Sequence, residues 1–263
     1  MKFLNGNELV GFIKERQAHQ VRGLIQHYKI QPKLAIITTK DDPVINVYMR
    51  LKQEYGADIL IDSEIHRVEQ GKELEQEIIE LNQDKSIHGI ILQLPLSSPA
   101  ETDKYVVQVD PEKDVDGLGS TEHFTPATAM AIDWLVNGYN VDLQGKKIAV
   151  VGKNGRLVGK PLLKLWEKYN PVGFGRDNDL SALREFDVVV SATGSARLIK
   201  PDMVGLGAVV IDGGTASEGG KIVGDIDPAV YERQDIVITP KIGGVGPLTV
   251  SALFDNVIKA ARL

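Results

Sequence analysis

Apolar residues along the chain fall into alternating helical and strand-like spacings. Over residues 8–29 they recur among charges in the pattern of an amphipathic helix that ends before Pro32. Short apolar runs predict buried strands at 33–39, 57–61 and 88–94, and the stretches from Pro43 onward and over 71–81 predict helices between them. Strands that alternate with helices favour a mainly parallel sheet with helices on both faces.

A second alternating series begins with a helix expected from Pro126 to about Val136. Its strands are expected at 147–151, 172–174, 187–191, 208–212 and 236–238. A final helix, 247–263, has a proline at its start and is expected to pack back on the first series.

These patterns predict an α/β protein of two domains, each with a mainly parallel sheet and helices on both faces. Glycine, serine and threonine break the pattern near 117–125, which sets the boundary. We assign residues 1–121 with helix 247–263 to a first domain, and residues 122–246 to a Rossmann-like second domain. A cleft between the two domains is expected.

Composition narrows the function classes. The net charge is −6 and the basic residues are scattered, which argues against a nucleic-acid partner. The absence of cysteine excludes disulfides and a cysteine nucleophile, and it fits a reducing compartment. The N-terminal sequence becomes polar too early for a signal peptide, and no apolar run approaches the roughly 20 residues of a membrane span, so we expect a cytoplasmic protein with no membrane partner. The five histidines show no ligand spacing, and no metal is expected.

A glycine-rich turn, Gly152-Lys-Asn-Gly155-Arg-Leu-Val-Gly159, joins the strand at 147–151 to a helix expected at 162–169. Such a turn lets the backbone approach a dinucleotide pyrophosphate, and the helix N-terminus favours its charge. The spacing is not GxGxxG, so a tight turn that binds nothing is the alternative.

Two charged residues after the next strand bear on the choice of dinucleotide. Arg176 suits the 2′-phosphate of NADP and Asp177 suits the ribose of NAD, so the choice stays open. The candidate cofactor-binding residues are Gly152, Lys153, Asn154, Gly155, Arg156, Gly159, Arg176, Thr193 and Gly194.

Polar residues of the first domain lie at strand ends or on a helix that follows a strand, where open parallel sheets build their sites. Tyr48 and Lys52 are four residues apart on one helix face. Gln93 closes a strand before Pro95, and the acidic pair Asp114 and Asp116 comes later. A surface tyrosine with a snorkelling lysine is the alternative for the first pair. Short-chain dehydrogenases also carry YxxxK, but there it follows the cofactor fold, whereas here it precedes it.

Several longer motifs occur together and in one order across most of the chain. They are Tyr48-Met-Arg-Leu-Lys52, Gly89-Ile-Ile-Leu-Gln-Leu-Pro-Leu96, Pro111-Glu-Lys-Asp-Val-Asp-Gly117, Gly207-Ala-Val-Val-Ile-Asp212, Gly224-Asp225 and Thr239-Pro-Lys-Ile-Gly-Gly-Val-Gly-Pro-Leu-Thr-Val250. In this the chain resembles the bifunctional methylenetetrahydrofolate dehydrogenase/methenyltetrahydrofolate cyclohydrolase family. The resemblance implies oxidation of 5,10-methylenetetrahydrofolate by NADP, with NAD possible, and then hydrolysis to 10-formyltetrahydrofolate. It also implies a homodimer acting in one-carbon metabolism, including purine biosynthesis.

The resemblance also implies residue roles. Lys52 is similar to the catalytic lysine, Gln93 to the residue that orients it, and Asp116 to the carboxylate that grips the pterin. Tyr48 resembles the aromatic residue that packs on the pterin and is grouped with these three in the catalytic set. The implied substrate-binding residues are Tyr48, Gln93, Leu94, Pro95, Asp116, Gly244, Gly246 and Pro247. These types suit the chemistry, because a desolvated lysine can act as a base and a carboxylate can accept two hydrogen bonds from a pterin edge.

The chain departs from the family pattern mostly on the cofactor side. Its glycine turn is one residue longer and lacks a serine, and the segment 118–124 is shortened. Ile242 replaces a proline, and Ile45 replaces a serine. We therefore hypothesise retained folate chemistry with altered dinucleotide preference or weakened dehydrogenation. The alternatives are a cyclohydrolase-only enzyme, a non-catalytic folate- or nucleotide-binding relative, and an oxidoreductase resembling shikimate dehydrogenase.

Overall fold

The computed structural model describes residues 2–119, 123–218 and 221–263, which form two compact units. The first unit comprises Gly11–Ala127 and Val250–Leu263. The second comprises the chain up to Val10 and Thr128–Thr249. The expected boundary falls partly on residues 120–122, which lie outside the described residues.

A three-stranded parallel sheet forms the centre of the first unit, in the order β3-β2-β4. Its strands are β2 (Lys33–Thr38), β3 (Asp62–Arg67) and β4 (Gly89–Leu92). Its helices are α1 (Gly6–Gly23), α2 (Pro43–Asp58), α3 (Lys72–Gln83) and α4 (Thr102–Val106). Helix α1 starts in the second unit and continues as a π-helical turn, Leu24–Tyr28. A 3-10 turn, Pro99–Glu101, precedes α4.

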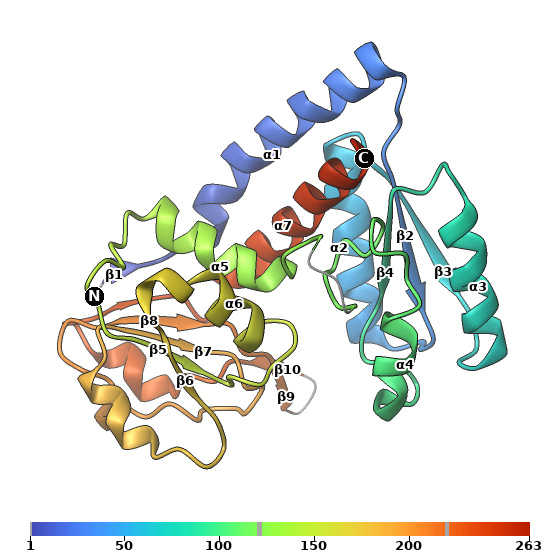
Figure 1. Cartoon of the computed structure of the whole chain (residues 1–263). Coiled ribbons are helices and arrows are strands. Elements are labelled where there is room, and N and C mark those ends of the chain that lie inside the picture. The colour runs from blue at the N-terminus through green and yellow to red at the C-terminus, as the bar shows by residue number, and fades with distance from the viewer. Residues whose placement is uncertain (1, 120–122, 219–220) are drawn as a thin grey trace. The chain divides into compact units, whose positions relative to one another are not determined.

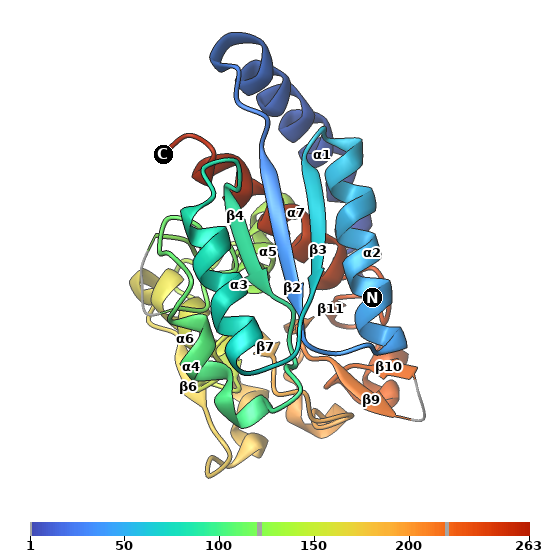
Figure 2. The ribbon, with the colours of Figure 1, turned by 90° about the vertical axis from the view of Figure 1, so that its right-hand side faces the viewer.

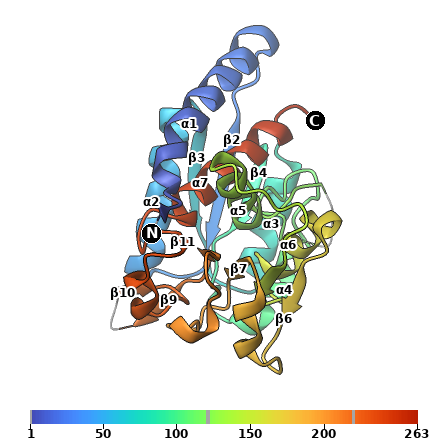
Figure 3. The ribbon, with the colours of Figure 1, turned by 90° about the vertical axis from the view of Figure 1, so that its left-hand side faces the viewer.

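Helices cover both faces of this sheet. On one face, Ile37 and Ile90 pack in a core with Ile78 of α3 and residues of α4. Figures 2 and 3 view the chain from opposite sides, and in both α2 runs alongside the edge strand β3. Tyr55 of α2 stacks on Phe254 of α7 (Val245–Ala260), with ring centroids 5.3 Å apart. The final helix thus packs within the first unit through its residues from Val250 onward.

The second unit is built on a six-stranded parallel sheet in the order β1-β11-β8-β7-β5-β6 (Figure 1). Its strands are β1 (Lys2–Phe3), β5 (Ile148–Val151), β6 (Val172–Phe174), β7 (Val188–Ser191), β8 (Val209–Asp212) and β11 (Val237–Ile238), and a separate hairpin joins β9 (Ala216–Glu218) to β10 (Lys221–Val223). The direction of strand addition reverses at β5, because β6 lies on one side of it and β7 on the other. Open α/β sheets bind ligands at the carboxyl ends of the strands where this reversal occurs.

The two faces of the six-stranded sheet are covered differently. The helices α5 (Ala127–Gly138) and α6 (Gly159–Leu165) lie on one side of β5 and β7 in Figure 1. The opposite face packs against residues from short 3-10 segments, and these segments are Leu180–Glu185, Pro201–Met203 and Pro228–Glu232. A further 3-10 turn, Glu167–Tyr169, follows α6. The predicted class, two α/β units with parallel sheets and a Rossmann-like second unit, is confirmed.

One predicted strand is wrong, and three details differ. The segment 57–61 is not a strand, because α2 continues to Asp58 and the strand follows at Asp62–Arg67. That strand forms the edge of its sheet and mixes exposed with half-buried residues, so its sequence is polar. The apolar run just before it, at 57–61, has the strand-like pattern instead. Residues before Val10, assigned above to the first domain, group with the second unit because β1 pairs with β11. The helix after the glycine turn begins at Gly159, and the β9–β10 hairpin was not predicted.

Within the described ranges, no helix combines the length and apolar character that crossing a membrane requires.

Candidate active site

The folate-site candidates of the first unit are organised around a bond between Lys52 and Gln93. The Lys52 Nζ donates to the Gln93 Oε1 at 2.7 Å. Lys52 lies on α2, whose start is fixed by the Asp42 carboxylate accepting from the N–H groups of Val44 (2.8 Å) and Ile45 (3.1 Å). Gln93 follows β4, and its backbone N–H donates to the Ile37 carbonyl at 2.8 Å. Two rigid elements therefore hold a lysine and an amide in register.

Asp116 supplies the charge opposite Lys52. Desolvation lowers the pKa of Lys52, and the negative charge of Asp116 acts against that shift. Desolvation raises the pKa of Asp116 to about 6, and Lys52 partly opposes this effect. Because both half-buried residues have lost much of their contact with water, each is closer to its neutral form than it is at the surface.

The neighbouring carboxylate, Asp114, has a different setting. It is buried and accepts hydrogen bonds from the backbone N–H groups of Gly119 (2.6 Å) and Leu118 (3.3 Å). These bonds shape the turn that follows the Lys-Asp-Val-Asp-Gly motif. Asp114 therefore supports the loop that carries Asp116.

The remaining candidates of the first unit flank this group. Tyr48 lies one turn before Lys52 on α2 and is half-buried, and desolvation raises its pKa. Leu94 and Pro95 follow Gln93, with the Leu94 carbonyl accepting from the Gln93 Nε2 at 3.0 Å. The structure thus brings Lys52 together with Gln93 and Asp116 in one unit.

In the second unit, the glycine turn leaves β5 at the point where strand order reverses. Gly152 has φ +94°, and a side chain there would begin 2.6 Å from the Ala192 carbonyl oxygen. At Gly159 a side chain would begin 2.0 Å from the Gly152 carbonyl oxygen. Only glycine permits this close packing of the turn against the first turn of α6. A dinucleotide pyrophosphate fits such a turn, which therefore suits the predicted cofactor.

Positively charged side chains lie at the end of β6. The side chain of Lys153 runs past Gly173 and Gly175, and its Nζ is 3.5 Å from the Asn178 Oδ1. Asn178 also accepts from the Gly175 N–H at 2.7 Å. Arg176 and Asp177 are exposed beside them. Two cations at this strand end fit the extra phosphate of NADP.

Thr193 and Gly194 follow β7, and an unpredicted carboxylate holds the first of them. The Asp225 Oδ2 accepts from the Thr193 N–H at 2.6 Å and from its hydroxyl at 2.9 Å. Gly194 adopts φ +68°. Asp225 belongs to the Gly-Asp motif noted in the sequence, but its position there gave no indication of its partners.

Gly244, Gly246 and Pro247 belong to the second unit, where α7 begins at Val245. Gly6 approaches Gly244 so closely that a side chain on Gly6 would begin 1.9 Å from the Gly244 carbonyl oxygen. The predicted folate-binding residues are therefore divided between the two units.

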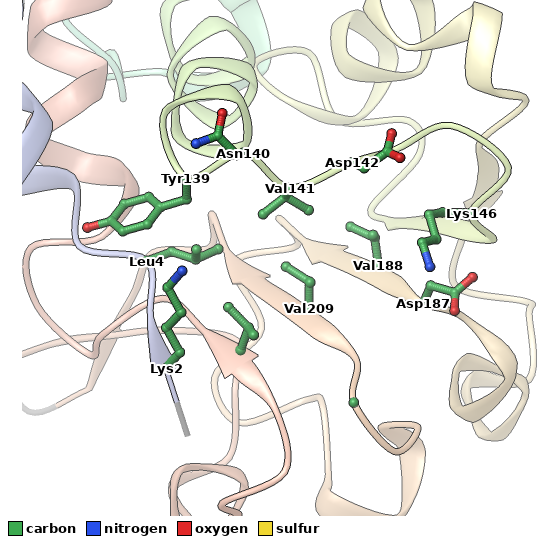
Figure 4. Close-up of a pocket in the computed structure, with 12 residues that line it drawn as sticks. Lys2, Leu4, Tyr139, Asn140, Val141, Asp142, Lys146, Asp187, Val188 and Val209 are labelled. Carbon is green, nitrogen blue, oxygen red and sulfur yellow. The ribbon is translucent and has the colours of Figure 1, made fainter.

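A pocket of about 310 Å³ lies beside the amino ends of the strands of the six-stranded sheet, whereas the glycine turn lies at their carboxyl ends (Figure 4). Val188 and Val209, the first residues of β7 and β8, contribute to its wall, and Lys146 and Asp187 lie at one side. None of the predicted site residues lines it.

Comparisons with known proteins agree with these geometries. The tetrahydrofolate dehydrogenase/cyclohydrolase catalytic-domain model matches residues 4–116, and the NAD(P)-binding-domain model of the same family matches residues 126–263. The bifunctional protein FolD of Hydrogenobaculum sp. is 36% identical over 282 residues, covering 100% of this chain and 99% of the relative.

Solved structures give the same result. The bifunctional FolD methylenetetrahydrofolate dehydrogenase/cyclohydrolase of Campylobacter jejuni superposes with a TM-score of 0.91 at 31% identity, covering 100% and 99% of the two chains. The Trypanosoma brucei enzyme, solved with NADP cofactor and an inhibitor, has a TM-score of 0.90 at 28% identity, covering 99% and 97%. The chain belongs to the tetrahydrofolate dehydrogenase/cyclohydrolase family.

Proposed function

We propose that this enzyme oxidises 5,10-methylenetetrahydrofolate to the methenyl form with NADP and then hydrolyses the product to 10-formyltetrahydrofolate. The observation that best supports this proposal is the setting of Lys52, which is desolvated, donates a hydrogen bond to Gln93 at 2.7 Å and interacts with the charge of Asp116. In this proposal the first unit holds the folate and the second unit holds the dinucleotide.

Hydrolysis requires water to lose a proton as its oxygen bonds to the methenyl carbon. Lys52 can accept that proton in its neutral form, which desolvation and the cationic substrate both favour. The Gln93 carbonyl oxygen accepts a hydrogen bond from Lys52 and so keeps the amine in place. The C–N bond of the adduct then breaks as its hydroxyl proton passes to the departing folate nitrogen, which leaves the formyl group, and Lys52 releases the first proton to solvent.

Substrate orientation is assigned to Asp116 and Tyr48. An ionised Asp116 can accept two hydrogen bonds from the amino and ring N–H groups of a pterin, and Tyr48 can pack on the ring. NADP, when bound, supplies the hydride acceptor for the oxidation. The glycine turn Gly152–Gly159 would hold the pyrophosphate, and Lys153 and Arg176 would contact the 2′-phosphate.

The first test replaces the proposed base. The Lys52→Met variant should hydrolyse methenyltetrahydrofolate roughly 100-fold more slowly than the native enzyme, because it lacks the proton acceptor. Arg50→Met is a matched control, since Arg50 is an exposed cation on the same helix. A native rate equal to that of Lys52→Met, measured by loss of methenyl absorbance, would refute the proposed hydrolysis.

A second candidate function is cyclohydrolase activity with weakened dehydrogenation, favoured by the lengthened glycine turn. Assaying methylenetetrahydrofolate with NADP and NAD separately distinguishes the two, because only the bifunctional enzyme reduces a dinucleotide at a rate comparable to hydrolysis. Faster reduction of NAD than of NADP would contradict the assignment of Lys153 and Arg176.

We also propose that the enzyme acts in the cytoplasm as a homodimer and supplies formyl groups to purine biosynthesis. The cysteine-free sequence fits a reducing compartment. Light scattering during gel filtration tests the dimer through the mass of the particle, which would be twice the chain mass of 28.8 kDa.

A further inference from the structure

Asp225 is a fully buried carboxylate to which the mechanism above assigns no role. Its Oδ2 accepts three hydrogen bonds, from the Ser191 hydroxyl (2.7 Å), the Thr193 N–H (2.6 Å) and the Thr193 hydroxyl (2.9 Å). Its Oδ1 is buried and finds no hydrogen-bond partner among the residues that the structure describes. A buried polar group is costly unless it is hydrogen-bonded, so a side chain with one oxygen bonded three times and the other unpaired is expected to do more than fill space.

The surrounding backbone leaves room for this carboxylate. A side chain on Gly214 would begin 2.1 Å from the Asp225 Oδ1. Asp212 bonds the same region, because its carboxylate accepts from the N–H groups of Gly214 (3.1 Å), Asp225 (3.1 Å) and Ile226 (3.2 Å). The backbone that carries Asp225 is therefore itself held in place.

The bonds of Asp225 act on the end of β7, which is also in contact with the glycine turn. A side chain on Gly152 would begin 2.6 Å from the Ala192 carbonyl oxygen and 3.3 Å from the Thr193 Cγ2. Ala192 and Thr193 thus line the inside of the turn where strand order reverses. Because Asp225 holds Thr193 in place, it also holds in place one wall of the expected dinucleotide site.

We propose that Asp225 is a positioning residue for the dinucleotide, which it serves by holding the Ser191–Thr193 segment against the glycine turn. This inference rests on the proposed function, because it takes that turn as the NADP site. Asp225 acts through Thr193 and is assigned no contact with the cofactor.

Removing the carboxylate should weaken the use of NADP selectively. In Asp225→Ala, three donors lose their acceptor and Thr193 is released, so KM for NADP should rise roughly 100-fold, as misplacement of a binding wall permits. Asp225→Asn keeps an oxygen that can accept the same three bonds and should bring KM back to within about tenfold of native. Ser191→Ala removes one bond of the three and should fall between Asp225→Ala and the native enzyme.

Two further measurements separate positioning from loss of fold. The proposed base for methenyl hydrolysis, Lys52, and its partners Gln93 and Asp116 lie in the first unit, so every variant should keep the native rate. Asp187→Asn is the matched control, because Asp187 accepts from the Lys147 N–H (2.8 Å) at the amino ends of the strands, whereas Asp225 bonds their carboxyl ends. It should leave KM for NADP unchanged.

The inference is overturned if Asp225→Ala keeps the native KM for NADP, or if hydrolysis and NADP use fall together in Ser191→Ala and Asp225→Asn. If Asp225→Ala does not fold, Ser191→Ala decides: a raised KM for NADP with native hydrolysis supports the inference, and an unchanged KM overturns it. If the native enzyme reduces no dinucleotide, the proposed dehydrogenase fails, and the NADP dissociation constants of the variants, measured by calorimetry, still decide this inference.

Discussion

Desolvation shifts the pKa values of Lys52 and Asp116, the two charged groups of the proposed folate site, in opposite directions. It lowers the pKa of Lys52, which makes the neutral, basic form of the amine easier to reach than at an exposed lysine. It raises the pKa of Asp116 to about 6, so that carboxylate is still mostly ionised at neutral pH but gains a proton below about pH 6, which sets an acidic limit on its use. The same loss of contact with water therefore favours the neutral, basic form of Lys52 and raises the pH at which Asp116 gains its proton.

That limit leads to a prediction about the pH dependence of the dehydrogenase. As pH falls through about 6, Asp116 gains a proton and loses the ability to accept two hydrogen bonds from the pterin. The kcat/KM for methylenetetrahydrofolate should then fall, approaching tenfold per pH unit well below that value. In Asp116→Asn this acidic limb should be absent and kcat/KM should be low throughout. An unchanged limb in the variant would assign the titration to another group.

At the scale of the elements, the C-terminal end of α3 is capped by the side chain of Lys113, a contact that the sequence did not predict. The Lys113 Nζ donates to the carbonyl oxygens of Leu81 (2.9 Å), Asn82 (2.8 Å) and Asp84 (2.7 Å). The last carbonyls of a helix have no partner within it and carry partial negative charge, so one ammonium group satisfies several of them. Lys113 is the first residue of the Lys-Asp-Val-Asp-Gly motif, but the family resemblance of that motif predicts a role only for Asp116.

Replacing Lys113 by methionine should therefore lower the free energy of unfolding by about 1–2 kcal/mol, the scale of losing hydrogen bonds to a charged group. The midpoint of urea unfolding measures the effect, and activity at low temperature should be unchanged. Lys104→Met serves as the control, because Lys104 pairs with Glu75 at the surface and should contribute little. Equal midpoints for the two variants would contradict the capping role.

What the sequence could predict depends on how local each signal is. The strand 33–39 and the helix from Pro43 were found because their patterns depend on adjacent residues. The strand at Asp62–Arg67 was missed because an edge strand needs few apolar residues. Lys52 stays a prediction, which rests on a four-residue spacing and a specific motif, and its bond to Gln93 agrees with that prediction. The bonds of Asp225 were missed because Ser191 lies 34 positions away, and no periodicity spans that separation.

At the scale of the whole molecule, the first unit depends on two separate segments of the chain. Phe254 is fully buried and stacks on Tyr55, although about two hundred residues separate them in sequence. Phe254→Ala should lower the free energy of unfolding by about 3–5 kcal/mol, because it removes a core side chain and leaves a cavity. Urea unfolding, with loss of methenyl hydrolysis followed in parallel, tests this. Lys259→Met, an exposed change on the same helix, should alter neither.

This division of the first unit has a consequence for biosynthesis. A ribosome releases residues in order, and Gly11–Ala127 emerge long before Val250–Leu263, which supply Phe254 and the rest of α7 within that unit. The nascent segment is therefore left with part of its apolar surface uncovered while Thr128–Thr249 of the second unit are translated. Chaperone binding to stalled nascent chains should be strongest in that interval and should end once α7 has left the exit tunnel.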